Sequence, residues 1–364
     1  MFKQIAGAAA LCGLSAAAIA QSSVTVYGSI DTAVEYLTHV GATRANVSRM
    51  GALTGAGASR LGFRGREDLG HGLKADFVLE MGFSPDSGTL GQGGRGFGRQ
   101  AFVGLSGPWG SASLGRQYNM IFWSNLDADI MGPNLHGNSS LDSYFPNARA
   151  DNALAYKGTF AGLTLGATYS FGRDSVNAGP SIAGANCAGE NAADSQACRA
   201  WSLMAKYDTP TWGAALAHDN QAGGTGAFAG LVRADQHDRR SLANAYLKLD
   251  HLKLGAGYMQ RKNDGSASMP QSGLWWLGAS YPVGAWRFDA QYSQLKFKNA
   301  DNKAQLLAVK STYALSKRTA VYASLGHVKN SGLSAVSVSS AQGGGAPLAG
   351  VNQTGLALGL SHAF

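Results

Sequence analysis

Apolar and polar side chains alternate along most of the chain with a period of two, in segments of about ten residues. The clearest segment places Leu73, Ala75, Phe77, Leu79, Met81 and Phe83 on one parity, and Lys74, Asp76, Val78, Glu80 and Gly82 on the other. Successive side chains of a β-strand point to opposite faces, so this pattern predicts a strand with one apolar and one polar face. The alternation recurs in 24–36, 163–171, 286–293 and 355–364. It is weaker in 97–106 and 241–249, which are assigned to strands on their spacing.

Sixteen strands are predicted in this way. They begin near residues 23, 58, 71, 97, 110, 150, 161, 199, 212, 238, 251, 271, 284, 302, 318 and 352. Every second connection is a tight turn, and those between are mostly longer and rich in Gly, Ser, Asn and Asp: 38–57, 84–96, 118–149, 173–198, 221–237, 263–270, 298–301 and 330–351. Short turns at one end and long loops at the other are typical of an up-and-down outer-membrane barrel.

Composition supports a closed barrel in a membrane. Charged residues are 14% of the chain, against about 25% in a typical soluble domain. After residue 20 no segment approaches the ~20 consecutive apolar residues of a spanning helix, which excludes a helical membrane protein. In hydrocarbon an unpaired strand edge is costly, so strands span only as a closed barrel, and sixteen strands leave an aqueous channel. The predicted fold is all-β, a 16-stranded antiparallel transmembrane β-barrel with an apolar outer face.

Residues 1–20 have the features of a signal peptide. Lys3 precedes an uncharged stretch from Ile5 to Ile19, and small residues occupy the −3 and −1 positions of a cleavage site after Ala20. The alternative is a short buried N-terminal helix. We therefore predict two regions, a signal peptide at 1–20 and a barrel at 21–364.

Cys187 and Cys198 are the two cysteines of the predicted mature chain. They lie eleven residues apart in a polar stretch, and export brings them to an oxidising compartment, so we predict a disulfide. The alternative is a pair of free thiols. No His lies near them, and no metal site is predicted.

The longest connection, 118–149, is the candidate constriction loop. Connections longer than ~12–15 residues inside a compact domain are usually functional. The loop carries Asp127, Asp129 and Asp142 together with the apolar residues Met120, Ile121, Phe122, Trp123, Leu126 and Ile130. An apolar cluster suits a loop that folds back into the barrel better than an external flexible loop, which is the alternative.

Arginines gather on the inward parity of the strands. Arg60 and Arg64 share the face opposite Leu61, and Arg99 opens the fourth strand. Cations in a narrow pore with low-dielectric walls concentrate anions. The alternative is that these arginines lie at strand ends and pair with nearby acids such as Asp151. The predicted constriction residues are the basic Arg60, Arg64, Arg99 and Arg149 and the acidic Asp127, Asp129 and Glu80.

Other chemistries are not indicated. The net charge is +8, or +7 without Lys3, and the charges are scattered singly, so no nucleic-acid footprint is present. The eight histidines form no HxxxH or HExxH motif. The glycine-rich stretch 91–98 is not followed by a helical pattern, which argues against a phosphate cradle. We predict neither an enzyme nor a cofactor.

Several motifs between residues 21 and 364 resemble those of Gram-negative general porins of the betaproteobacterial and neisserial type. They are QSSVTVYG at 21–28, SRLGFRGREDLGHGLKA at 59–75, RQAFVGL at 99–105, LGRQ at 114–117, LSKRT at 315–319 and GLSHAF at 359–364. The resemblance implies a homotrimer of sixteen-stranded barrels in the outer membrane of a Gram-negative bacterium. It also implies that Arg60, Arg99 and Arg149 line the constriction. Gln100 departs from some anion-selective relatives, which carry a second basic residue there.

The predicted function is therefore a general diffusion porin, a passive and weakly anion-selective channel for small hydrophilic solutes and inorganic anions. A substrate-specific channel and a barrel whose external loops act as an adhesin remain alternatives. The aromatic C-terminus, Phe364, resembles the signal read by the outer-membrane insertion machinery. The predicted partners are that machinery, outer-membrane lipids and two further copies of the chain.

Overall fold

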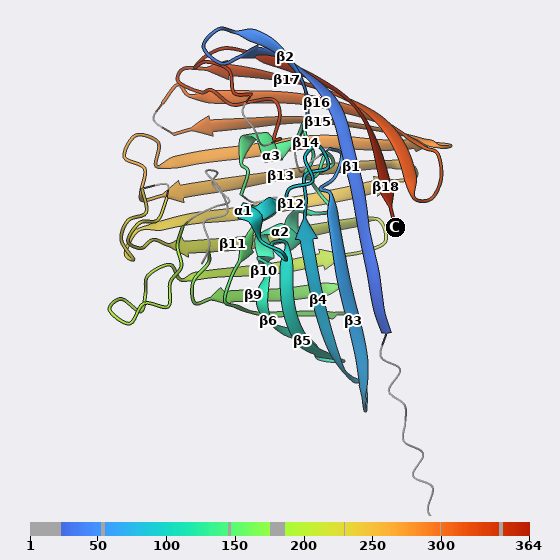
Figure 1. Cartoon of the computed structure of the whole chain (residues 1–364), viewed down its shortest axis with the longest axis vertical. Coiled ribbons are helices and arrows are strands. Elements are labelled where there is room, and N and C mark those ends of the chain that lie inside the picture. Colours follow the sequence, from blue (N-terminus) through green and yellow to red (C-terminus); the bar gives the residue numbers. More distant parts are fainter. Residues whose placement is uncertain are drawn as a thin grey trace, which may run out of the picture.

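The computed structural model describes residues 23–51, 55–144, 147–174, 186–228, 230–298, 300–341 and 345–364. The predicted signal peptide lies outside the described residues. Strands dominate the structure and form one antiparallel sheet that closes on itself (Figure 1). No helix in the described part of the chain is long and apolar enough to cross a bilayer.

The elements follow one another in this order. They are β1 (Ser23–Val40), β2 (Ala45–Met50), β3 (Arg60–Gly70), β4 (Leu73–Gly82), α1 (Gly91–Gly94), β5 (Gln100–Gly107), β6 (Gly110–Tyr118), α2 (Met120–Asn125), α3 (Asn138–Leu141), β7 (Arg149–Ala150), β8 (Ala153–Phe160), β9 (Leu163–Ser170), β10 (Ala200–Asp208), β11 (Trp212–Ala222), β12 (His237–Leu249), β13 (Leu252–Asn263), β14 (Gln271–Val283), β15 (Trp286–Phe297), β16 (Lys303–Ala314), β17 (Thr319–Ser331) and β18 (Gln353–Ala363).

Sixteen of these strands form the barrel wall, which confirms the predicted strand number. Each begins within three residues of its predicted start. The two extra strands are short: β2 folds back on the end of β1 as a hairpin, and β7 pairs with the end of β6 over two residues. The segment that contains β2 was predicted as part of the connection 38–57.

The barrel closes through β1. One edge of this strand pairs with β18, from Ser29 opposite Ala363, and its other edge pairs with β3, from Ser23 opposite Arg66. Phe364 extends the closure beyond the last strand, because its carbonyl accepts a hydrogen bond from the amide of Gly28 at 3.0 Å. The sheet therefore has no free edge among these strands, as a hydrocarbon environment requires.

The two faces of the wall differ as the alternation predicts. Val24, Leu216 and Leu358 are 65%, 63% and 60% exposed on the outer surface. Their neighbours of opposite parity face inward and include buried polar groups such as Glu35 and Gln353. An apolar exterior around a polar interior is the arrangement of a transmembrane barrel, the reverse of a soluble one.

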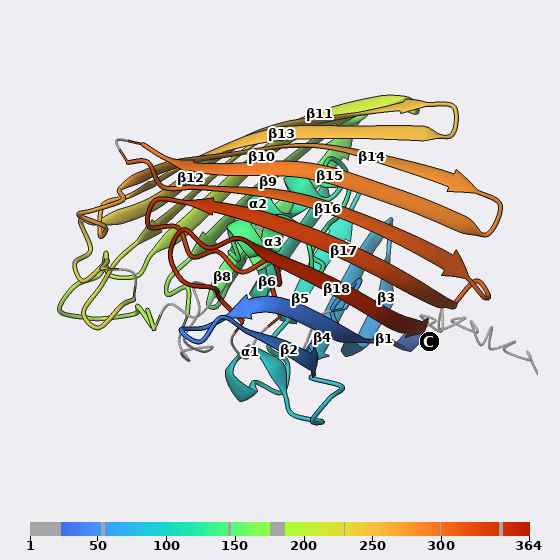
Figure 2. The ribbon, with the colours of Figure 1, turned by 90° about the horizontal axis from the view of Figure 1, so that it is seen from above.

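Helices α2 and α3 lie within the ring of strands (Figures 1 and 2). α2 lies against the inward faces of β9–β12, where the backbone amide of Ile121 donates to the Ser202 hydroxyl at 3.2 Å. Further along, the indole nitrogen of Trp276 donates to the Ala128 carbonyl at 3.1 Å. Segment 118–149 is therefore attached to the inner wall at several points.

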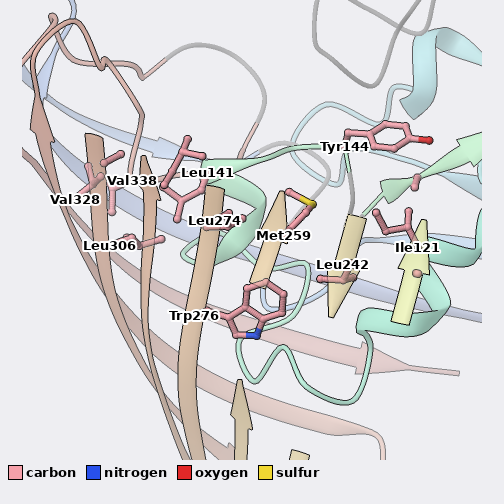
Figure 3. Close-up of a cluster of buried hydrophobic side chains, with 14 of the residues drawn as sticks. Ile121, Leu141, Tyr144, Leu242, Met259, Leu274, Trp276, Leu306, Val328 and Val338 are labelled. Atoms are coloured by element: carbon pink, nitrogen blue, oxygen red, sulfur yellow. The ribbon is translucent and has the colours of Figure 1, made fainter. Parts of the chain in front are cut away.

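An apolar stripe on the inner wall receives this segment. Figure 3 shows inward side chains of several strands gathered around loop residues such as Ile121 and Leu141. The strand residues of the stripe are Met204, Leu242, Met259, Leu274, Trp276, Leu295, Leu306 and Val328. Burial of these side chains holds the segment in place, since each fully buried large apolar side chain contributes about 1.5–3 kcal/mol.

A second external connection also turns inward. Val338, between β17 and β18, is fully buried in the same apolar cluster. The amide of Ser340 donates to the Leu135 carbonyl at 2.8 Å, and the Ser140 hydroxyl donates to the Val338 carbonyl at 2.8 Å. The described part of connection 332–352 thus packs on segment 118–149, which the sequence patterns did not predict.

Candidate pore constriction

A network of charged groups covers the inner wall where β3, β4 and β5 meet. The antiparallel register places Glu80 of β4 opposite Gln100, directly after Arg99. Arg99 Nε donates to Glu80 Oε1 at 2.7 Å, and Arg60 Nε lies 3.7 Å from Glu80 Oε2. The Tyr27 hydroxyl donates to the same Oε2 atom at 3.0 Å. One carboxylate therefore organises two arginines and a tyrosine.

Tyr118, at the end of β6, extends this network. Its hydroxyl accepts a hydrogen bond from Arg99 at 2.7 Å and another from Arg149. The guanidinium carbon of Arg149 also lies 4.2 Å from the centre of the Tyr118 ring, within the range of a cation–π contact. Arg60, Glu80, Arg99, Tyr118 and Arg149 thus form one continuous chain of contacts.

Arg64 lies beside the network, where its guanidinium carbon is 5.2 Å from the centre of the Tyr27 ring. We call Arg60, Arg64, Glu80, Arg99 and Arg149 the positive wall. Four guanidinium groups and one carboxylate give it a formal charge of +3. A guanidinium group stays protonated at physiological pH, so this charge persists near neutrality.

Glu80 and Arg99, two members of the positive wall, do not lie where they were predicted. Glu80 was expected among the acids that face the arginines, but it lies between Arg60 and Arg99 and offsets part of their charge. Arg99 was expected to face water, but it is only 8% exposed because Glu80 and Tyr118 enclose it. Arg60 and Arg64 retain more exposed side chains. Arg99 therefore positions the network more than it presents charge to the lumen.

The acids of segment 118–149 lie against other strands. Asp127 forms an ion pair of 2.5 Å with Lys206 of β10, which also lies 3.1 Å from Asp208. Asp142 lies 3.1 Å from Nε of Arg240, a fully buried side chain that also pairs with Asp238 at 3.0 Å. These carboxylates are partly neutralised by cations of the wall that holds the segment.

Asp129 was predicted to face the pore, but its side chain is buried. Its carboxylate accepts hydrogen bonds from the Asn125 amide at 3.2 Å and the Gln291 amide at 3.0 Å. Loss of hydration on burial raises the pKa of this carboxyl group above its ordinary value, and the hydrogen bonds from the two amides offset only part of that rise. The apolar stripe causes this burial, because it draws segment 118–149 close to the wall.

Cys187 and Cys198 form a disulfide in the external connection between β9 and β10. Both are buried and pack with Ala227 of the next external connection. The amide of Cys198 donates to the Gly223 carbonyl at 2.7 Å. The disulfide therefore lies in the external connections, outside the barrel and apart from the positive wall.

Several residues of the site were not singled out from the sequence. Tyr27 and Tyr118 connect the arginines, and Lys206 and Arg240 hold the loop acids. Tyr27 lies in the alternating segment 24–36, but alternation alone does not reveal its partner, Glu80. Trp276 carries a clearer signal, because two successive tryptophans in one strand must place one ring inside the barrel.

Comparison with known proteins agrees with this architecture. A family model described as Gram-negative porin matches residues 7–333. Outer membrane porin protein 32 of Delftia acidovorans is 32% identical, over 98% of this chain and 98% of the relative. An outer membrane porin protein of Bordetella pertussis is 30% identical, over 91% of this chain and 95% of the relative.

Solved structures give the same result. An anion-selective porin from Comamonas acidovorans superposes with a TM-score of 0.75 at 29% identity, covering 94% of this chain and all of that chain. OmpT of Vibrio cholerae has a TM-score of 0.66 at 14% identity, which shows a shared fold. These matches confirm the resemblance seen in the sequence and the predicted fold. The chain belongs to the Gram-negative porin family and forms a sixteen-stranded barrel of the outer membrane.

Proposed function

We propose that this porin is a passive, weakly anion-selective channel for small hydrophilic solutes and inorganic anions. The observation that carries the proposal is the asymmetry of charge inside the barrel. The positive wall holds four arginines around one carboxylate, whereas Asp127 and Asp142 pair with Lys206 and Arg240 of the wall that holds segment 118–149. A permeating anion therefore meets uncompensated positive charge. The similar Comamonas acidovorans porin is itself described as anion-selective.

We further propose that segment 118–149 narrows the pore beside the positive wall. Its contacts with Ser202, Gln291 and Trp276 support this role, because they keep the segment inside the ring of strands. Lys157 of β8 lies 3.9 Å from the centre of the Trp123 ring, which places a further cation beside α2. Solutes would then pass between α2 and the strands that carry the arginines.

The test is the zero-current potential of single channels in a planar bilayer under a salt gradient. Replacement of Arg60 and Arg149 together by Ser should move this potential toward the cation side. The matched control is the double variant R199S/R233S, which also removes two arginines but from the external connections. The proposal fails if both double variants shift the potential equally or if the wild-type channel prefers cations at ~0.1 M salt, where the Debye length is ~10 Å.

The same recordings separate a general porin from a substrate-specific channel. A general porin gives a current that no single solute blocks at low concentration, whereas a specific channel shows solute-dependent block. An adhesin barrel would show neither effect but would lose partner binding when its external connections are exchanged. Nothing in the positive wall groups a nucleophile with a base, so we propose a channel and no catalysis.

We propose that the channel assembles as a homotrimer through the outer face of β3–β6. Val103, Leu105 and Leu114 are exposed there and form an apolar surface. A solved structure of Vibrio cholerae OmpT, which shares the fold, is described as a trimer form. Native mass spectrometry of the detergent-extracted protein should give three chains per particle, and a single-chain particle under mild extraction would contradict the proposal.

We propose that Phe364 serves as the signal for outer-membrane insertion. Support comes from its place at the closure, where its backbone amide and carbonyl both bond to Gly28. Deletion of Phe364 should lower the amount of folded barrel in the outer membrane while secretion to the periplasm continues. Because this deletion also removes a closure bond, the variant F364A, which keeps the backbone, separates the two roles. Normal assembly of F364A would contradict a signal read from the ring.

A further inference from the structure

One lysine inside the barrel carries a charge that no neighbouring acid balances. Lys157 of β8 lies on the inward parity, in register with Ser111 of β6, and its side chain is only partly exposed. Its ammonium group lies 3.9 Å from the centre of the Trp123 ring. Among the described residues this ammonium forms neither an ion pair nor a hydrogen bond, and the charged side chain that acts on it is another cation, Lys206. A partly buried cation without a counterion favours an anion from solution.

A partly open cavity of about 100 Å³ lies beside this ammonium, between α2 and the inner faces of β4–β6 and β8. Its lining combines Lys157 with the rings of Phe102, Tyr118 and Trp123. Phe102 lies on the inward parity of β5, since the side chain of its neighbour Val103 is exposed on the outer surface. An apolar cavity of about 150 Å³ binds benzene, so the space here suits a molecule with a single ring.

The aromatic side chains at this cavity belong to one cluster. Trp123 meets Tyr118 edge-on, with ring centres 5.8 Å apart, and it meets Phe122 edge-on at 5.3 Å. The rings of Tyr118 and Phe122 are stacked. Because aromatic rings prefer stacked and edge-on neighbours, a cluster of this kind favours a further aromatic ring beside it.

The other charged groups near the cavity also favour an anion. Asp76 of β4 lines the cavity, but its carboxylate pairs with Arg66 at 2.5 Å. The hydroxyl of Tyr118 accepts hydrogen bonds from Arg99 and Arg149, so the cavity adjoins the positive wall. The field in this part of the lumen therefore favours a solute with a carboxylate over one with an ammonium group.

We propose that this cavity binds a small aromatic carboxylate, a molecule of the benzoate class. Its carboxylate would pair with the Lys157 ammonium, and its ring would lie against Phe102 and Trp123. An aliphatic acid would satisfy only the charge, and a neutral aromatic solute only the rings. The inference deepens the proposed function and rests on it, because the solute reaches the cavity through the lumen. Binding is expected to be weak, since conduction requires that a bound solute leaves again.

The experiment measures binding of 4-fluorobenzoate to the purified barrel in detergent by fluorine NMR, at equilibrium and without a membrane. Wild type should bind with a dissociation constant of about 1–10 mM, and K157Q about tenfold more weakly, because a hydrogen bond to a charged group is lost. The matched control is K253Q, which should bind as wild type does. Lys253 is another inward lysine, 5.1 Å from the centre of the Tyr246 ring, but it does not line the cavity. Equal binding by K157Q and wild type would overturn the proposal.

Three further measurements separate the role of the charge from that of the ring. Fluoroacetate has the charge without the ring, and 4-fluorobenzyl alcohol has the ring without the charge, so both should bind about tenfold more weakly than 4-fluorobenzoate. Equal binding of either compound would overturn the proposal, because it would show a site for any carboxylate or for any ring. F102A, which keeps Lys157, should weaken binding of 4-fluorobenzoate about threefold, and unchanged binding would overturn the placement of the ring.

This test is separate from that of the proposed ion selectivity. Binding of 4-fluorobenzoate to a channel that prefers cations would support the cavity while contradicting the proposed selectivity. An anion-selective channel that does not bind 4-fluorobenzoate would support the selectivity and overturn the cavity.

Discussion

Two regions of the barrel interior use charge in opposite ways. The positive wall, on the segment from β3 to β7, gathers cations around Glu80 and leaves Arg60 partly exposed and Arg64 exposed. The docking wall, formed by the inward faces of β10–β17 that contact segment 118–149, buries its cations and pairs them with acids. Arg240 is the clearest case, since it is fully buried between Asp142 and Asp238.

The difference indicates a division of labour. A buried ion pair loses hydration and offers no field to a passing solute, so the docking wall uses charge to fix the position of the loop. The apolar stripe around Trp276 and Leu306 has the same role. Exposed arginines around a single carboxylate do the reverse, because they leave positive charge directed at the lumen. We therefore expect substitutions in the docking wall to change stability first and those in the positive wall to change selectivity first.

The largest stability effect is expected from R240M. The substitution removes the guanidinium group that pairs with Asp142, and breaking a buried pair costs about 3–5 kcal/mol. Segment 118–149 should loosen, with greater open-channel noise and faster proteolysis near Asp142. R233M is the control, because Arg233 and Asp235 form an exposed pair outside the barrel, and exposed pairs contribute little to stability. Similar noise in the two variants would show that the docking wall does not fix the loop.

The substitution E80Q tests the positive wall by raising its positive charge instead of lowering it. Loss of its carboxylate raises the formal charge of the wall from +3 to +4, so anion preference should rise. Arg99 also loses a charged acceptor while buried, which should destabilise the barrel by about 1–3 kcal/mol. The zero-current potential and the denaturation midpoint measure the two effects. A shift toward cations would place Glu80 outside the network that sets selectivity.

Asp127 and Asp129 allow a partly exposed and a buried carboxylate of the same segment, 118–149, to be compared. D127N removes one of the two carboxylates that pair with Lys206, a carboxylate that is 43% exposed, and should raise anion preference slightly. D129N should leave selectivity unchanged, because this carboxylate is buried among amides. Equal shifts in the potential would show that both carboxylates face the pore.

The buried carboxyl group of Asp129 should also make the docking of segment 118–149 depend on pH. Burial raises the pKa of its carboxyl group in the folded protein, so the folded state holds the proton more tightly than the unfolded state. Stability is then greatest below the ordinary pKa of Asp and falls as pH rises through the raised value. Open-channel noise should therefore increase over that range in wild type and stay constant in D129N. Parallel profiles would assign the dependence to another group.

The smallest effect on conduction is expected from C187S/C198S. The disulfide lies in the external connections, so the zero-current potential should not change. A disulfide commonly contributes about 2–4 kcal/mol by restricting the unfolded chain, so the external connection should become more sensitive to protease. A changed potential in this variant would mean that the connection reaches the permeation path.

The barrel itself was predictable because lipid and water impose a strict alternation on every spanning strand. The outward residues Val24, Leu216 and Leu358 follow that rule. The docking wall was not predictable, since Leu274 and Trp276 are apolar side chains on the inward parity, which a period-two pattern assigns to polar residues. They face inward because segment 118–149, distant in sequence, covers them.

The arginines of the positive wall could be predicted as a group but not as a network. The alternation places Arg60 and Arg64 inside the barrel. Their distance from Arg149, however, depends on the pairing register of four strands, which the alternation does not reveal. The same register brings Glu80 beside Arg99, and a pattern within one strand does not contain that pairing.

The most direct test of the division between the two walls is the zero-current potential of the wild-type channel and R60S/R149S under the same salt gradient at ~0.1 M. The potential of wild type should lie on the anion side, and that of the double variant should move toward the cation side while the barrel remains as stable. A cation-selective wild type, or a double variant with the potential of wild type, would contradict the assignment of selectivity to the positive wall.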